Sequence, residues 1–234
     1  NMWYDRDIDA VMSRTKTRAI PSGKITAEAA LTFGILLAGG SVMVMGLAIN
    51  WVAAILLMVT IMFYVFVYTV WLKRRTPQNI VIGGAAGAFP PMIGWAAATG
   101  TVSVESIILF TIIFIWTPPH FWALSLYRSD DYKAAGVPMM PLVYGRYETK
   151  KQILLYSIVL GPLGIVPFWL GTLGAVYGVT SVLLGVLFIG AAWRVMRNDS
   201  EKNCKQLFGF SIFYLFFLFF AMIVDRCVDF NPIL

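Results

Sequence analysis

One amide and two carboxylates open the chain at a spacing of four residues. Asn1, Asp5 and Asp9 would share one face of a helix, because each step of four residues drifts by only about 40° around the axis, whereas Asp7 would point elsewhere. Stacked carboxylates repel each other and weaken a helix. Mg²⁺ removes that repulsion, and it is usually held by one or two carboxylates together with substrate phosphates. The pattern indicates a magnesium and phosphate site; a solvated acidic helix end at a membrane surface is the alternative.

A second acidic pair, Asp130-Asp131, lies in the longest polar connector of the chain, next to Arg128 and Tyr132. Two acidic clusters that are distant in sequence but lie at one membrane face would hold Mg²⁺ ions bridging a diphosphate from both sides. The flanking Arg and Tyr would supply the phosphate contacts and the anchoring of a lid. Taken alone, the connector is equally consistent with a solvated turn.

Basic residues follow the first acidic segment and recur after the second long apolar run. Arg14 and Arg18 are one helical turn apart, and Lys73 and Arg74 end an apolar run. Both groups are suited to binding a diphosphate or another anionic head group. The structural alternative is anchoring, because Lys and Arg at the ends of membrane spans extend their charged heads into the interface.

The single histidine, His120, follows Pro118 and Pro119 in an apolar run. Prolines remove backbone donors and free nearby carbonyl groups. This histidine either faces the substrate or is a buried polar side chain whose hydrogen bonds are satisfied within the protein, and both interpretations stay open. Pro90 and Pro91 predict a kink or a break in the preceding apolar run.

The elements that position these residues are predicted to be transmembrane helices. The 234 residues are 59% hydrophobic and 13% charged, whereas soluble domains are about 25% charged. Seven apolar runs reach the length of about 20 residues that crosses a bilayer. We therefore expect an all-α bundle in a single membrane-embedded domain, residues 1–234. The runs cover residues 26–49, 51–72, 80–98, 104–127, 152–173, 175–197 and 207–224.

The basic residues predict the orientation of this bundle. If alternate connectors share one side of the membrane, that side holds all 18 Lys and Arg residues except Arg226. The positive-inside rule makes that side cytoplasmic, or the matrix in a mitochondrion, and it also carries both acidic segments. Cys204 and Cys227 fall on opposite sides, so no disulfide is expected between them.

Charge placement also excludes other classes of protein. The net charge of +6 comes from short connectors, so membrane topology explains it better than nucleic-acid binding does. Ion pumps and proton-coupled carriers need ionisable residues along their pathway. Glu28 and Glu105 lie at the ends of spans and no acidic or basic residue lies in mid-membrane, which argues against a transporter.

These motifs resemble the UbiA superfamily of intramembrane prenyltransferases, and within it the protoheme IX farnesyltransferase (haem O synthase) subfamily. The likeness runs along most of the chain. It is carried by Asn1-x-x-x-Asp5-Arg-Asp7-Ile-Asp9, Met12-x-Arg14-Thr15, Tyr68-Thr-x-x-Leu72-Lys73-Arg74, Asn79-Ile-x-Ile-Gly83-Gly84, Gly87-Ala-x-Pro90-Pro91-x-Ile-Gly94-Trp95, Trp116-x-x-Pro119-His120-Phe121 and Asp131-Tyr132-x-x-Ala-Gly-Val-Pro138-Met. Two positions depart from the family pattern: Ala19 replaces a usual proline, and Asp130-Asp131 replaces the D-x-x-x-D of many relatives.

The resemblance implies a UbiA-type bundle of nine spans, of which seven are present here and the first two are expected to be missing. It further implies transfer of a farnesyl group from farnesyl diphosphate to a vinyl group of haem B, giving haem O, with Mg²⁺ as cofactor. Aromatic faces that would stabilise the allylic cation are Tyr68, Trp95, Trp116 and Phe121.

The resemblance also assigns site residues. The catalytic residues would be Asp5, Asp9, Lys73 and Asp131. The metal ligands would be Asp5, Asp9, Asp130 and Asp131. The substrate-binding residues would be Asn1, Arg14, Arg74, Asn79, His120, Arg128 and Tyr132.

Several alternatives to this function stay open. A UbiA-type enzyme acting on a quinone precursor would share the Asp motifs, and a non-catalytic haem-handling membrane assembly protein would need neither farnesyl diphosphate nor Mg²⁺. A CDP-alcohol phosphotransferase is disfavoured, because its D-G-x-x-A-R opening is absent. The expected setting is a bacterial inner membrane, with a mitochondrial inner membrane as the alternative. Haem A synthase or cytochrome oxidase assembly factors are the implied protein partners.

Overall fold

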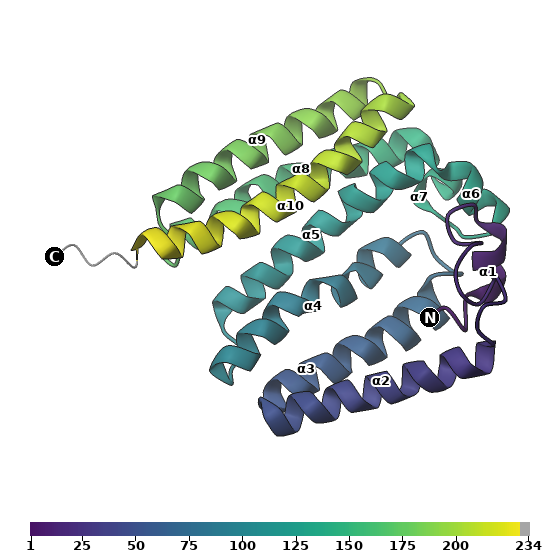
Figure 1. The fold of residues 1–234 in the computed structure, drawn as a ribbon. Coiled ribbons are helices and arrows are strands. Elements are labelled where there is room, and N and C mark those ends of the chain that lie inside the picture. The colour runs from purple at the N-terminus through teal and green to yellow at the C-terminus, as the bar shows by residue number, and fades with distance from the viewer. Residues whose placement is uncertain (230–234) are drawn as a thin grey trace.

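The computed structural model describes residues 1–229, which form a bundle of long helices (Figure 1). Seven helices are long and apolar enough to cross a membrane, as the sequence predicted. Within the described residues no β-strand is present, so the all-α prediction is confirmed. The long helices are α2 (Ala27–Ala48), α3 (Trp51–Met62) continued by a π-helix, η1 (Phe63–Leu72), α4 (Asn79–Thr99), α5 (Val104–Tyr127), α8 (Gly145–Trp169), α9 (Ala175–Arg197) and α10 (Glu201–Asp229).

Successive long helices alternate in direction, so alternate connectors gather at one end of the bundle (Figure 1). That end also carries three short helices, α1 (Arg6–Val11), α6 (Ser129–Ala134) and α7 (Met140–Val143). Both acidic segments therefore lie at the same end, which is the arrangement that the distribution of basic residues predicted. We call it the acidic end of the bundle.

The core lies mainly between the later helices. Large side chains of α5, α8, α9 and α10 are fully buried there, whereas most of α2 is exposed on the bundle surface. An apolar helix that is exposed outside a bundle faces lipid. The largest of the buried core side chains are Trp122, Tyr177, Phe188 and Tyr214.

The boundaries of two spans differ from the predicted ones. Helix α8 begins at Gly145 rather than 152, and α10 covers Glu201–Asp229 rather than 207–224. The apolar runs end where charged residues begin, but Lys and Glu are good helix formers and extend the helices into water. At its other end α8 stops four residues early, because Gly171 adopts a left-handed φ of 70° and closes a helix-terminating turn.

The prediction of a helix over residues 1–9 is wrong for its first half. Residues 2–5 form turns and α1 begins at Arg6. The predicted one-turn spacing of Asn1, Asp5 and Asp9 is nevertheless kept. The backbone amide of Asp5 donates to the carbonyl of Asn1 at 2.9 Å, and the amide of Asp9 donates to the carbonyl of Asp5 at 2.8 Å. Asp5 and Asp9 are buried, whereas Asp7 is exposed.

The π-helix η1 was not predicted. Its backbone hydrogen bonds join residues five apart: the amide of Lys73 donates to the carbonyl of Tyr68 at 2.9 Å. The side-chain hydroxyl of Thr69 spans the same interval and donates to the carbonyl of Tyr64 at 2.8 Å. This geometry is rare and often marks functional sites. Of the two expected outcomes at Pro90 and Pro91, a break does not occur, since α4 continues through both prolines. A kink stays a prediction.

Candidate active site

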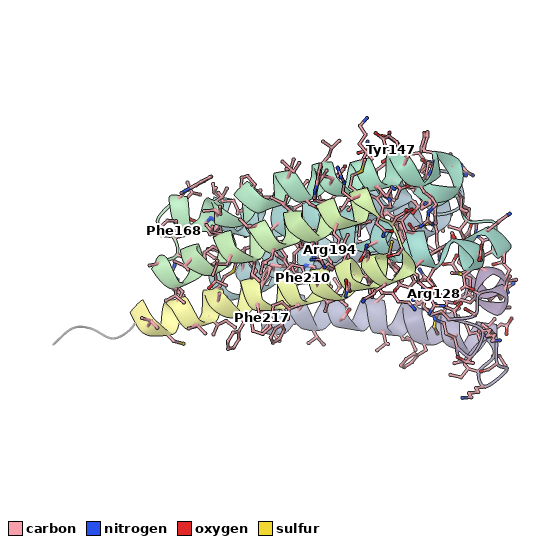
Figure 2. All side chains as sticks on the ribbon, turned by 90° about the horizontal axis from the view of Figure 1, so that it is seen from above. Arg128, Tyr147, Phe168, Arg194, Phe210 and Phe217 are labelled. Atoms are coloured by element: carbon pink, nitrogen blue, oxygen red, sulfur yellow. The ribbon has the colours of Figure 1, made fainter. Side chains whose placement is uncertain are left out.

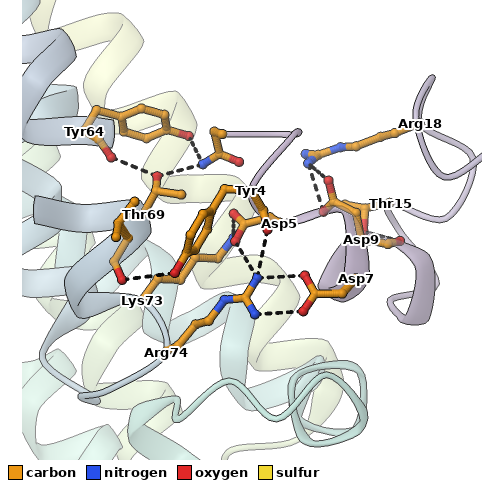
Figure 3. A network of polar contacts seen from close by, with 12 residues as sticks. Tyr4, Asp5, Asp7, Asp9, Thr15, Arg18, Tyr64, Thr69, Lys73 and Arg74 are labelled. Atoms are coloured by element: carbon orange, nitrogen blue, oxygen red, sulfur yellow. Dashed lines mark hydrogen bonds and ion pairs between the residues drawn. The ribbon is translucent and has the colours of Figure 1, made fainter. Parts of the chain in front are cut away.

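Asp5 lies at the centre of a polar network that joins the opening segment to the end of η1 (Figure 3). Its side chain is 0% exposed, and Nζ of Lys73 lies 2.5 Å from its Oδ2. Arg74 adds a second positive charge 3.5 Å from Oδ1. A buried carboxylate is costly unless a cation accompanies it. Lys73 therefore offsets the cost of burying Asp5, and Asp5 in turn fixes the position of the Lys73 ammonium group.

Arg74 is held chiefly by Asp7 rather than by the site interior. Its guanidinium donates to both carboxylate oxygens of Asp7 at 2.7 Å, and its Cζ lies 4.9 Å from the centroid of the Tyr4 ring. These hydrogen bonds lower the pKa of the Asp7 carboxyl to about 2, although its side chain is 62% exposed. Arg74 thus balances two carboxylates of the opening segment.

Asp9 has a guanidinium partner of its own (Figure 3). Arg18 donates to its two carboxylate oxygens at 2.9 and 3.1 Å, and the Thr15 hydroxyl donates to its carbonyl oxygen at 3.0 Å. The sequence predicts that Arg14 and Arg18 bind an anionic head group, but it does not identify Arg18 as the partner of Asp9. The chain turns after α1, and a contact formed across such a turn leaves no periodic signal.

Asn1 is fixed by two residues of the π-helix. Its side-chain amide donates to the Tyr64 hydroxyl at 2.8 Å and to the Thr69 hydroxyl at 3.1 Å. Tyr64 and Thr69 are five residues apart, which is the repeat that the hydrogen bonds of η1 follow. The π-helix therefore places both hydroxyls where one amide reaches them. Neither residue was among the predicted site residues.

The two acidic segments meet at the acidic end of the bundle. Ser13, just beyond α1, donates a hydrogen bond from its hydroxyl to Oδ2 of Asp131 in α6 at 2.6 Å. Below this contact, Ile8 and Met12 pack against Val137 and Met139, which follow α6. The two acidic segments are therefore in contact, as the sequence predicted, and an apolar cluster supports this contact. That their carboxylates share a ligand stays a prediction.

A cavity of about 330 Å³ opens beside these segments. Its polar lining includes three cationic side chains near the acidic end, whereas most of its apolar lining belongs to α4 and α5. Such a combination suits a ligand with an anionic head and an apolar tail. The polar residues are Asn1, Asp9, Arg14, Arg18, Tyr64, Lys73, Thr117 and Tyr132; the apolar and aromatic ones include Tyr68, Ile80, Gly83, Gly84, Gly87, Ile113, Trp116 and Phe121.

Three of the four predicted aromatic faces border this cavity: Tyr68, Trp116 and Phe121. Trp95 does not. It borders a larger, mostly apolar cavity of about 740 Å³, which also involves Glu105 and Arg226 and lies toward the opposite end of the bundle. The position of Trp95 near the far end of α4 explains the difference, because two helical turns separate it from the residues of α4 that line the first cavity.

His120 lies behind the cavity wall and does not line it. Its ring is stacked between Trp116 and Phe208, with centroid distances of 4.3 and 4.6 Å. Its Nδ1 is 2.6 Å from the hydroxyl of Ser211, and the indole N–H of Trp116 donates to the Ser211 carbonyl at 2.8 Å. In this arrangement His120 supports the cavity wall formed by Trp116.

The other predicted residues occupy the surroundings of the cavity. Asn79 is buried and donates to the Thr76 carbonyl at 2.6 Å, while its Oδ1 has no hydrogen-bond partner among the described residues. Arg128 is exposed at the acidic end (Figure 2), with its guanidinium 5.7 Å from the centroid of the Tyr127 ring. Asp130 is exposed and Asp131 is half-buried.

The donor set at the opening segment fits a magnesium ion. Asp9 and Asn1, which carry carboxylate and amide oxygens, border the cavity, and Oδ1 of Asp5 is buried without a hydrogen-bond partner among residues 1–229. Oxygen ligands of this kind, completed by waters and phosphate oxygens, are what Mg²⁺ takes. Within residues 1–229, no three His, Cys, Asp or Glu side chains form a group able to hold a metal by themselves. An ion held by these oxygens would complete its coordination with waters and with phosphate oxygens of a substrate.

Curated relatives match almost the whole chain. It is 57% identical to the protoheme IX farnesyltransferase of Parvibaculum lavamentivorans over 230 residues, which covers 97% of this chain and 72% of that protein. It is 56% identical to the protoheme IX farnesyltransferase of Bartonella henselae over 229 residues, with coverages of 96% and 73%.

Solved structures share the fold at low sequence identity. A digeranylgeranylglyceryl phosphate synthase superimposes with a TM-score of 0.79 at 21% identity, covering 96% of this chain and 78% of that one. A UbiA homologue from Aeropyrum pernix K1 in its apo form gives a TM-score of 0.69 at 17% identity, with coverages of 96% and 84%.

The model of the UbiA prenyltransferase family matches residues 1–221. This match covers all of the long helices except the end of α10, and it includes both acidic segments and the cavity between them. The protein is an integral membrane protein, and it belongs to the UbiA prenyltransferase family.

Proposed function

We propose that the protein transfers the farnesyl group of farnesyl diphosphate to a vinyl group of haem B, which gives haem O. The observation that carries the reaction type is the cavity, which joins cationic side chains at the acidic end to apolar walls inside the bundle. A prenyl diphosphate has a head and a tail that match these two parts. Haem B as acceptor is supported by the relatives named protoheme IX farnesyltransferase, at 57% and 56% identity.

The cationic residues of the cavity would stabilise the departing diphosphate. The bond between the allylic carbon and the diphosphate oxygen breaks, and its electron pair leaves with the diphosphate. Lys73, Arg14 and Arg18 border the space in which this charge develops. Cations fixed before the reaction stabilise such charge without reorganisation. Asp5 contributes indirectly, since it holds the Lys73 ammonium group in place.

The walls of the cavity would protect the allylic cation. Tyr68, Trp116 and Phe121 offer aromatic faces, which attract positive charge. Apolar surroundings also exclude bulk water, which would otherwise capture the cation. The π electrons of the haem vinyl group would then form the new carbon–carbon bond, which leaves a positive charge on the vinyl carbon next to the porphyrin ring. One water molecule adds to that carbon and loses a proton, which gives the hydroxyl group of haem O. His120 acts in this proposal by supporting Trp116 from behind.

Mg²⁺ is the cofactor of the proposed reaction. Asp5 and Asp9, together with Asn1, would hold one ion, and Asp131 with Asp130 would hold a second. When bound, the metal neutralises the charge that builds up on the diphosphate. Of the other predicted substrate-binding residues, Tyr132 borders the cavity, whereas Arg74, Asn79 and Arg128 do not.

We further propose that the acidic end faces the cytoplasm from a bacterial inner membrane. All basic residues except Arg226 lie at or near that end, as the positive-inside rule requires of a cytoplasmic face. The relatives at 57% and 56% identity are bacterial proteins. Haem A synthase and cytochrome oxidase assembly factors stay as predicted partners.

The decisive experiment is an assay of the purified full-length protein in lipid nanodiscs. Haem B and farnesyl diphosphate are supplied with and without Mg²⁺, and the product is identified by liquid chromatography and mass spectrometry. We expect haem O only in the presence of Mg²⁺. An aromatic quinone precursor serves as the competing acceptor. Prenylation of that acceptor but not of haem B would replace the proposed function with its alternative, and haem binding without turnover would favour a haem-handling protein.

A further inference from the structure

The cavity extends from the acidic end into the bundle along α4. Gly87 borders it eight residues after the start of α4, which corresponds to a depth of about 12 Å. Ile113 and Trp116 of α5 line the same deep part, whereas Lys73 and Arg18 line the outer part. A prenyl diphosphate bound by these cations would therefore direct its tail toward Gly87.

Three glycines of α4 line the cavity, and two of them are required by packing. A Cβ atom at Gly83 would lie 2.2 Å from Cδ2 of Tyr68, and one at Gly84 would lie 2.8 Å from Cγ2 of Thr117. At Gly87, by contrast, a Cβ would meet no atom within 4 Å. Packing among residues 1–229 therefore does not require glycine at position 87, and glycine lowers helix stability relative to alanine. What glycine does provide there is free space in the cavity.

We propose that Gly87 is a specificity-determining residue that sets the length of the prenyl chain the enzyme accepts. This inference rests on the proposed function, because it takes the donor to be a prenyl diphosphate. Each isoprene unit adds five carbons to the tail while the diphosphate stays the same. A side chain at position 87 would occupy the deep part of the cavity, so it excludes long tails and leaves the binding of the head group intact.

The test uses Gly87→Ala and Gly87→Leu in the full-length protein in nanodiscs. The kcat/KM for haem B prenylation is measured with farnesyl, geranyl and dimethylallyl diphosphate. We expect the ratio of farnesyl to geranyl transfer to fall at least tenfold in Gly87→Leu, with an intermediate value in Gly87→Ala. Activity with the shorter donors is retained.

Gly94→Leu is the matched control. Gly94 is exposed on the same helix, a Cβ there also meets no atom within 4 Å, and the residue does not border the cavity. The ratio should stay at the wild-type value in this variant. An equal shift in Gly94→Leu would overturn the inference, since any added side chain on α4 would then have the same effect.

A binding measurement separates this inference from the proposed function. Farnesyl and geranyl S-thiolodiphosphates, which do not react, are titrated by calorimetry in the absence of haem B. Gly87→Leu should weaken the binding of the farnesyl compound at least tenfold relative to the binding of the geranyl compound. Absence of haem prenylation in the wild type would refute the proposed acceptor only, whereas an unchanged preference for chain length in folded Gly87→Leu would refute the role of Gly87.

Discussion

The hydroxyl of Ser13 donates a hydrogen bond to Oδ2 of Asp131 at 2.6 Å, across 118 positions of sequence. The bond connects the segment after α1 to α6, so it links the two acidic segments directly. A hydrogen bond to a carboxylate also orients its oxygens. Ser13 therefore positions Asp131 relative to Asp9, which lies one turn earlier in the same segment.

Loss of this hydrogen bond should weaken turnover without preventing folding. For Ser13→Ala we expect kcat/KM for farnesyl diphosphate to fall about fivefold, which corresponds to about 1 kcal/mol for one partly exposed hydrogen bond. Ser13→Thr keeps the hydroxyl and should stay near the wild-type value. The assay is haem O formation at saturating haem B, repeated over a range of Mg²⁺ concentrations. Equal losses in both variants would argue against an effect of the hydrogen bond.

The buried pair of Asp5 and Lys73 should be essential for activity. Asp5→Asn leaves the Lys73 ammonium group without its carboxylate and removes a metal ligand of the proposed site, so we expect haem O formation to fall at least 100-fold. Asp7→Asn is the matched control, because Asp7 is exposed and borders no part of the cavity. Size-exclusion chromatography in detergent checks that both variants insert and fold. Activity of Asp5→Asn near the level of Asp7→Asn would refute the catalytic role.

Apolar length was sufficient to predict the seven membrane spans, and charge placement was sufficient to predict which connectors gather at one end of the bundle. Each of these signals is local: a run of about 20 apolar residues must cross the bilayer, and basic connectors select its side. The two acidic segments could be assigned to one membrane face because an even number of spans separates them along the chain, and successive spans alternate in direction. The ends of α8 and α10 could not be placed, since charged helix formers continue a helix beyond its apolar part.

The contacts within the site depend on tertiary structure, and the sequence alone did not reveal them. Arg18 reaches Asp9 only because the chain turns back after α1, and Asn1 reaches Tyr64 and Thr69 only because η1 winds as a π-helix. The sequence of η1 has no proline or glycine that marks a change of winding. Its geometry is fixed by contacts between segments that are distant along the chain.

The pair of Asp7 and Arg74 predicts a specific dependence of stability on pH. Arg74 lowers the pKa of Asp7 in the folded protein from its ordinary value of 3.8 to about 2. A lowered pKa means that the folded state binds this proton less readily than the unfolded state does. The stabilisation is therefore complete above pH 4 to 5 and is lost as the pH falls toward 2.

Thermal unfolding in detergent between pH 3 and pH 7 tests this dependence. Wild type should exceed Asp7→Asn in stability at pH 6 by about 0.5 kcal/mol, because exposed ion pairs contribute little. The difference should shrink as the pH falls below 4. A difference that stays constant down to pH 3 would show that the effect of Asp7 does not depend on its ionisation.

Asp225 should stabilise the fold from the end of the bundle opposite to the site. Its side chain is buried, and its carboxylate accepts hydrogen bonds from the backbone amides of Gly174 and Tyr177, at the start of α9. A carboxylate from α10 thus satisfies free amides of another helix and interacts favourably with its dipole.

For Asp225→Ala we expect a loss of about 2 kcal/mol in unfolding free energy, because one buried hydrogen bond, one partly buried hydrogen bond and the dipole interaction are removed together. Glu105→Gln is the control, because Glu105 is an acidic residue at the same end of the bundle and its side chain is more exposed than that of Asp225. The kcat/KM of folded Asp225→Ala should match the wild-type value at a temperature well below its midpoint, since the cavity with Lys73 lies at the other end. Unfolding is followed by circular dichroism in detergent. A selective loss of turnover with unchanged stability would contradict a purely structural role for Asp225.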